Sequence, residues 1–104
     1  MLGNIKQLME AKAKIDKMQK ELKNIKIQEV GMDGKIKVIV NGMGEVLDIN
    51  LSQDLMNEKD FKKIEKNLVS LINSAQKKAQ QTSAQRMQEL LKDLPPEIRK
   101  QLGI

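Results

Sequence analysis

The sequence predicts an α+β fold, with a helix, a three-stranded antiparallel meander and a longer helix in succession. Apolar residues recur at helical spacing in two long stretches, one near each end of the chain. Between these stretches lie three short aliphatic runs, separated by two glycine-containing turns. The chain has 104 residues, the length of one domain, so residues 1–104 are expected to form a single unit.

The first helix is expected from about residue 4 to residue 24. Its apolar residues alternate at spacings of four and three, the pattern of a coiled-coil seam: Leu8, Ala11, Ile15, Met18, Leu22 and Ile25. Six lysines surround this seam, with Lys6, Lys17 and Lys20 opposite it and Lys12, Lys14 and Lys23 on its flanks.

Strands are expected at about residues 25–30, 35–40 and 45–51. We predict a register that places Val38 opposite Leu47, Ile36 opposite Ile49, and Gly31 opposite Gly34. A slip of one residue would scatter the apolar side chains over both faces of the sheet. One face is then aliphatic, with Ile25, Ile27, Ile36, Val38, Val40, Leu47, Ile49 and Leu51. The other face is mixed: it holds Lys26, Gln28, Lys35, Lys37, Asp48 and Asn50, with Val30, Ile39 and Val46 among them. This face is therefore either open to solvent or partly buried against a partner subunit.

The long helix is expected at about residues 58–93, with its cap near Asn57. Its apolar stripe narrows to Ala, Ser and Thr between residues 76 and 85, so that part is either exposed or closely packed. Pro95 and Pro96 end the helix. Residues 95–104 are expected to be a short tail.

A tight homodimer is expected, because Phe61 is the one aromatic residue and a monomer's core would be thin. Two amphipathic helices beside a small sheet need further surface to cover their apolar stripes. The residues assigned to the core and dimer face are Ile36, Ile39, Val38, Val40, Val46, Leu47, Ile49 and Leu51.

The composition argues against an enzyme. The chain has no His and no Cys, the residues that most often serve as general bases, thiolate nucleophiles and metal ligands. We therefore expect no cofactor, no metal and no small-molecule substrate. The longest strongly apolar run, residues 38–40, is far too short to cross a membrane, and no signal-peptide pattern is visible. These features predict a cytoplasmic protein without a membrane partner.

Positive charge is concentrated in the helical segments. Residues 1–26 have seven Lys and three acids, residues 27–58 have two Lys and six acids, and residues 59–104 have ten Lys or Arg and five acids. Segregated lysines favour binding of a polyanion through its phosphates. Two Arg and no stacking aromatics leave little means of reading bases, which favours duplex DNA with little or no sequence preference. The alternative is a prefoldin-like helical holdase.

The sequence resembles the YbaB/EbfC family of bacterial nucleoid-associated proteins. The resemblance rests on residues 35–51, an aliphatic strand, an Asn-Gly turn and a second strand of the type V-x-x-I/V-x-I. It continues in residues 73–79, which match N-x-A-x-x-x-A, and in Leu94-Pro95-Pro96. The chain departs from the family pattern in a sparser glycine turn at residues 31–34 and in Glu97 after the prolines.

The resemblance implies an α-β-β-β-α monomer and a tight homodimer whose projecting helical arms embrace DNA. It also implies a nucleoid location and effects on gene expression. Because the family has no compact DNA-contact motif, the DNA-binding residues are assigned from charge. They are Lys6, Lys12, Lys14, Lys17, Lys20 and Lys23 on the first helix, and in second place Lys77, Lys78 and Arg86 on the long helix.

Overall fold

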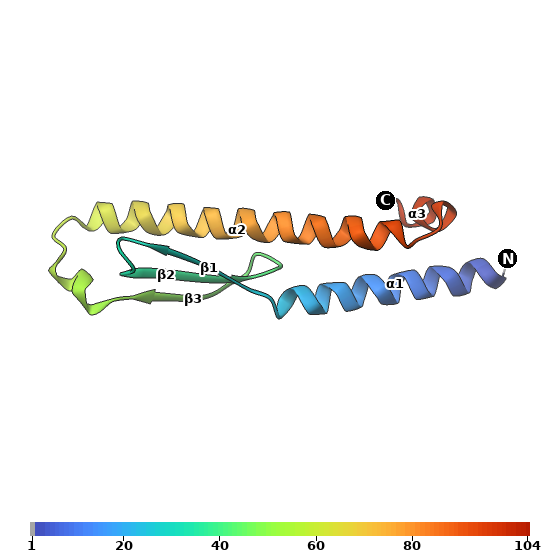
Figure 1. Ribbon diagram of the computed structural model, residues 1–104, viewed down its shortest axis with the longest axis horizontal. Coiled ribbons are helices and arrows are strands. Elements are labelled where there is room, and N and C mark those ends of the chain that lie inside the picture. Colours follow the sequence, from blue (N-terminus) through green and yellow to red (C-terminus); the bar gives the residue numbers. More distant parts are fainter. Residues whose placement is uncertain (1) are drawn as a thin grey trace.

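One long helix runs along most of the length of the molecule and packs against two of the strands and the first helix (Figure 1). The computed structural model describes residues 2–104, with side chains from Ile5 onward, as a rod with extents of 67 × 18 × 15 Å. Its elements are α1 (Leu2–Lys23), β1 (Lys26–Gly31), β2 (Ile36–Asn41), β3 (Val46–Leu51), the 3₁₀ turn η1 (Gln53–Asn57), α2 (Phe61–Lys92) and α3 (Pro96–Leu102). This arrangement confirms the predicted α+β class.

The three strands form an antiparallel sheet in the order β1-β2-β3, and the N-terminal half of α2 covers one face of β1 and β2. Ile36, Val38 and Val40 of β2 are completely buried under that helix. Ala75 and Ala79 of α2 are equally buried and belong to the same cluster. Ala75 and Ala79 are closely packed here, because alanine lets the helix approach the sheet. In the narrowed part of the stripe, residues 76–85, only Ala79 is buried, whereas Thr82 and Ser83 are half-buried and Ala84 is exposed.

The register differs from our prediction by two residues in both hairpins. Val38 pairs with Ile49 and not with Leu47, and Gly31 pairs with Ile36 and not with Gly34. The pairing is shifted because the turns between the strands are longer than we predicted. The first turn occupies residues 32–35, and Met32, Asp33 and Gly34 all have positive φ. A bulge in the second hairpin brings Val40 opposite Val46. Away from this bulge, a shift of two residues leaves each side chain on its predicted face.

The second turn is organised by Asn41, whose buried side chain makes three hydrogen bonds. Its Oδ1 accepts from the backbone N–H groups of Met43 and Glu45, both at 3.0 Å, and its Nδ2 donates to Glu45 Oε1 at 3.0 Å. The next residue, Gly42, donates its N–H to the carbonyl oxygen of Leu22 at 2.8 Å. The turn thus caps the C-terminal end of α1 and fixes α1 against the sheet.

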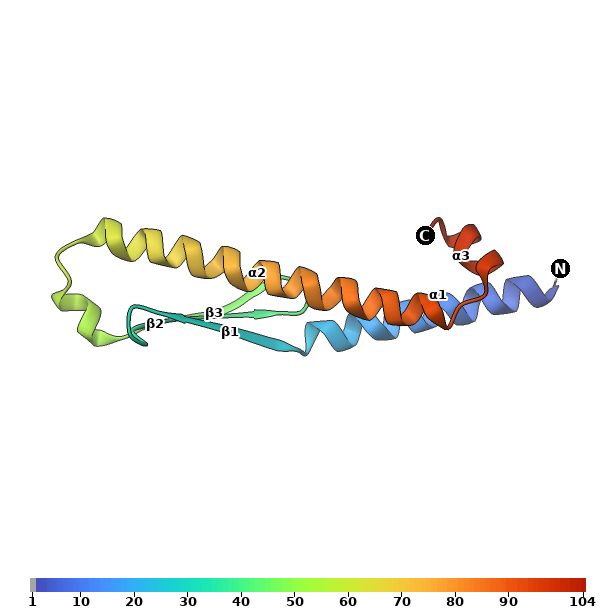
Figure 2. The same ribbon diagram turned by 45° about the horizontal axis from the view of Figure 1, so that its top comes forward.

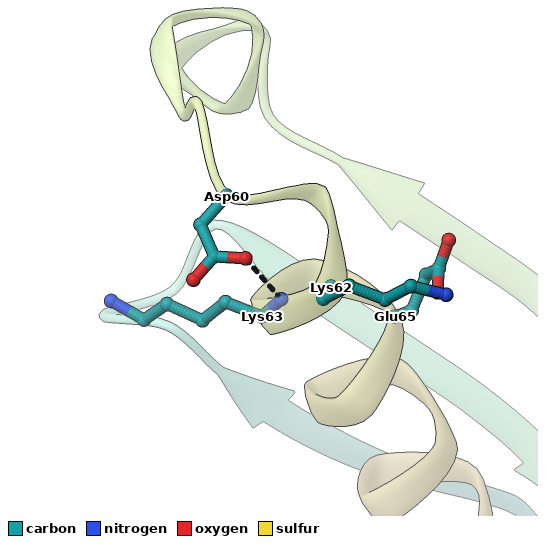
Figure 3. Close-up of polar contacts among 4 residues, drawn as sticks. All are labelled: Asp60, Lys62, Lys63 and Glu65. Carbon is teal, nitrogen blue, oxygen red and sulfur yellow. Dashed lines mark hydrogen bonds and ion pairs between the residues drawn. The ribbon is translucent and has the colours of Figure 1, made fainter.

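The long helix begins at Phe61, three residues later than predicted, because Asp60 and not Asn57 is its N-cap. The Asp60 carboxylate accepts a hydrogen bond from the backbone N–H of Lys63 at 3.1 Å (Figure 3). Asn57 instead ends the 3₁₀ turn η1, which buries Leu55 at the edge of the core. Such caps satisfy one of the open N–H groups of the first helical turn.

The C-terminal half of α2 extends beyond the sheet and packs against α1, so these two helices form the arm of the molecule (Figure 2). Of the predicted seam, Ala11, Met18 and Leu22 are buried, and Leu8, Ile15 and Ile25 are half-buried. Among the described residues, no helix is long and apolar enough to span a bilayer.

The predicted tail is wrong, because residues 96–102 form a helix, α3, that folds back onto α1. Pro96 occupies the first helical turn, and Gly103 ends the helix in the left-handed conformation with φ of 76°. Ile98 is buried in a cluster with Ala11 and Leu94. Ile98 and Leu102 are one helical turn apart and both pack in this cluster. This spacing of two apolar residues indicates a helix, which the prediction of a tail did not take into account.

Gly42→Ala is expected to lower the free energy of unfolding by about 1–3 kcal/mol. A β-carbon at this position would lie 2.7 Å from the Leu22 carbonyl oxygen and disturb the bond that caps α1. Met43→Ala, in the same turn but at an exposed side chain, is the control and should change stability little. Urea denaturation of both variants measures the difference. Equal midpoints for the two would refute the structural role of Gly42.

Candidate nucleic-acid interface

The position of α2 gives the rod two sides. Its N-terminal half covers one face of β1 and β2, and its C-terminal half packs against the seam of α1. The opposite sides of α1 and of the sheet therefore lie on the same side of the molecule. We refer to this surface, formed by the outer side of α1 and the open face of the sheet, as the averted face.

All six lysines assigned to α1 are exposed: Lys6, Lys12, Lys14, Lys17, Lys20 and Lys23. By helical spacing, Lys6 and Lys20 are on the side of the helix opposite its buried seam, and so on the averted face. Lys17 lies at the border of this face, where it also lines the groove between α1 and α2. None of the six has an ion-pair partner within the part of the chain that the structure describes. Their charge is therefore available to a polyanion.

The groove between α1 and α2, by contrast, has balanced charge. It is lined by the cations Lys14, Lys17 and Arg86 together with the carboxylates of Glu21, Glu89 and Asp93. Arg86 lies 3.8 Å from Glu21 across this groove. Because three carboxylates offset three cations, the groove itself is a poor site for phosphates.

The other two assigned residues of α2 are in different situations. Lys78 forms an ion pair with Glu29 of β1, with its Nζ 2.6 Å from Glu29 Oε1. The Ser74 hydroxyl donates to the same carboxylate at 3.1 Å. The hydrogen bond from Lys78 is the main reason that the pKa of Glu29 is lowered, and burial only partly opposes it. Lys78 thus links α2 to β1 through an ion pair. Lys77 is exposed and makes no ion pair among the described residues.

The residues assigned to the core and dimer face separate into two groups. Ile36, Val38 and Val40 are buried within the protomer, and Ile39 is half-buried on the open face of the sheet. Val46, Leu47, Ile49 and Leu51 are exposed, because α2 packs on β1 and β2 and leaves β3 uncovered.

Exposed apolar side chains gather on β3, on the flank of α2 beside it and at the start of α2, and we refer to this set of residues as the apolar trough. The side-chain amide of Gln76 donates to the carbonyl of Gly44 at 3.1 Å, which turns that flank of α2 toward the start of β3. Val69 is two helical turns earlier on the same flank and is 58% exposed. The trough comprises Val46, Leu47, Ile49, Leu51, Val69 and, at the end where α2 begins, Met56 and Phe61. The sequence analysis did not assign Val69, Met56 or Phe61 to this surface. The position of Phe61, the single aromatic residue, at the start of α2 could have indicated it.

No grouping of carboxylates that could hold a metal ion occurs in the described part of the chain.

Comparison with known proteins gives the family. The model of the YbaB/EbfC DNA-binding family matches residues 1–94. The chain belongs to this family. A nucleoid-associated protein of Sulfurihydrogenibium sp. (strain YO3AOP1) is 33% identical over 92 residues, covering 84% of this chain and 83% of the relative. A nucleoid-associated protein of Pelotomaculum thermopropionicum is 28% identical over 98 residues, covering 90% and 93%.

Among solved structures, an uncharacterized protein from Helicobacter pylori has a similar fold. It superposes with a TM-score of 0.72 at 22% identity, covering 86% of this chain and 92% of that one. This similarity supports the fold alone, and the family assignment rests on the sequence comparisons.

Proposed function

We propose that this member of the YbaB/EbfC family is a nucleoid-associated protein of the bacterial cytoplasm that binds duplex DNA as a homodimer. The observation that carries the proposal is the set of exposed lysines on α1, which form no ion pair among the described residues. The family's description as DNA-binding and the nucleoid-associated relatives support the same function.

The binding is expected to depend on phosphates and hardly on base sequence. Lysine ammonium groups act as point charges on phosphates, and their affinity comes from counterion release. Bidentate reading of guanine needs arginine, and one of the two Arg, Arg86, lies beside Glu21. The single aromatic residue, Phe61, lies at the start of α2, in the apolar trough and away from these lysines. A preference for particular sequences is therefore not expected.

The apolar trough is proposed as the homodimer interface. A C2 contact uses the same patch on both subunits, and the trough presents the exposed aliphatic side chains of the edge strand β3, with Phe61 at the start of α2. Exposed strand edges are also the usual place for a second chain to dock. Burying this patch would add Phe61 and Leu51 to a core that is thin in the single protomer.

A prefoldin-like holdase is less well supported. Only the C-terminal half of α2 packs against α1, and α3 packs against the tip of that arm. Among the described residues, the groove between the two helices is lined mainly by charged side chains, which suit an unfolded apolar client poorly. DNA binding is thus the function that we propose.

Replacing Lys6, Lys17 and Lys20 by Gln is expected to weaken duplex binding strongly. If all three contact phosphates, the slope of log K against log salt should fall by about 2.7, at about 0.9 per contact. Lys62, Lys63 and Lys66 on α2 are replaced by Gln as the control, which removes the same charge from another surface. Fluorescence anisotropy over a salt series measures both. A wild-type slope in the α1 variant would contradict the assignment to α1.

Ile49→Glu is expected to convert a dimer into a monomer, because it places a carboxylate in the centre of the apolar trough. Val30→Glu is the matched control, since Val30 is 45% exposed and Ile49 39%, but Val30 lies on the open face of the sheet. Sedimentation equilibrium gives the mass of each. A monomeric wild type would end the dimer proposal, and dissociation of the Val30 variant alone would move the interface to the open face.

A further inference from the structure

The averted face does not end where α1 ends. The chain leaves α1 at Lys23 and enters β1 at Lys26, so the outer side of the helix continues into the open face of the sheet. Both parts point away from the same helix, α2 (Figure 2). Whether the positive charge of α1 also continues onto the sheet depends on which strand side chains point to that face.

Alternation along the strands answers this question. In β2, Ile36, Val38 and Val40 are buried under α2, so Lys37 and Ile39 between them belong to the open face. Gln28 pairs with Ile39 in the register and therefore shares its face. Lys26, two residues before Gln28, is on the same face at the junction with α1.

The acids of the sheet segment largely avoid this face. Glu29 points to the α2 side, where Lys78 and Ser74 bind its carboxylate. Four others lie in turns or in the connection to α2: Asp33, Glu45, Asp54 and Glu58. Asp48 alone is on the open face of the strands, opposite Ile39, and the side-chain amide of Asn50 donates to it at 3.0 Å. The segment is acidic in sequence, but its open face has two lysines and one carboxylate.

We propose that the DNA-binding surface continues from α1 onto the open face of the sheet, where Lys26 and Lys37 contact phosphates. This inference rests on the proposed DNA binding and assigns two residues that the charge of the helices did not indicate. From Lys6 to Lys37 the surface spans about 45 Å by the rise per residue of helix and strand. One turn of B-DNA is about 34 Å, so a duplex laid along this face would meet it over more than one turn.

The homodimer proposed above leaves this face free. The apolar trough lies on the α2 side of β3, whereas Lys26 and Lys37 are on the opposite side of the sheet. The open face is also mainly polar, with the amide of Gln28 beside the lysines as a further donor to phosphate oxygens.

The test is the double variant Lys26→Gln/Lys37→Gln, compared with Lys62→Gln/Lys66→Gln on α2, in the full chain. Both remove two positive charges, but from different surfaces. The first variant is expected to lower the slope of log K against log salt by about 1.8, at about 0.9 per contact. The second should keep the wild-type slope. An unchanged slope in the first variant, or an equal loss in both, would overturn the inference.

A proximity measurement gives an independent result, because the natural chain has no cysteine. Gln28→Cys places one thiol on the open face of the sheet, and Ser70→Cys places one on an exposed part of α2 beside Lys62 and Lys66. With a photo-crosslinker on that thiol, a 40-base-pair duplex is expected to crosslink to the first protein and not to the second. Crosslinking from position 70 alone would overturn the inference.

These experiments separate the two proposals. If the α1 lysine variant loses binding while Lys26→Gln/Lys37→Gln binds as the wild type does, DNA binding stands and its extension onto the sheet is wrong. If the wild-type protein shows no salt-dependent binding of duplex DNA, the proposed function fails and the extension fails with it.

Discussion

The close packing of α2 on β2 is the contact on which the rest of the structure depends. Ala75 and Ala79 have no side chain beyond Cβ, so the helix lies directly over the three buried aliphatic residues of β2. The helix has 32 residues, about 48 Å at 1.5 Å per residue, whereas each strand has only six. The same straight helix therefore covers the sheet and also pairs with α1. Because it occupies one side of both, it defines the averted face.

The position of α2 determines on which side of the molecule the charged side chains lie. The formal charge of the chain is only +5, and the strands and turns are acidic as a segment. The fold nevertheless turns Glu29 toward Lys78 on the α2 side and keeps most other acids of the segment off the open strand face. The lysines of α1 remain exposed on the opposite side. A basic surface is thus produced by the placement of charges more than by their number, and apolar contact with a second copy would use a different side of the molecule.

Much of the fold could be predicted from the sequence, because period-2 and period-3.6 patterns determine which side chains are buried. The strand faces were predictable even though the register was shifted by two residues, since that shift preserves the face of each side chain away from the bulge. The register itself depends on the turn with positive φ at Met32 and Asp33, which the pattern of glycines does not show. For the site, exposure of the α1 lysines followed from the seam. The ion pairs of Lys78 and Arg86 join residues far apart in the chain, so local patterns could not reveal them.

The central claim, that duplex DNA lies along the averted face, is tested most directly by NMR. Backbone amide shifts of the uniformly labelled protein would be followed during titration with a 20-base-pair duplex. The account predicts that the largest changes fall on the outer side of α1 and on β1 and β2, while the outward side of α2 around Ser70 changes little. Changes concentrated on the outward side of α2, with α1 and the strands unaffected, would contradict it.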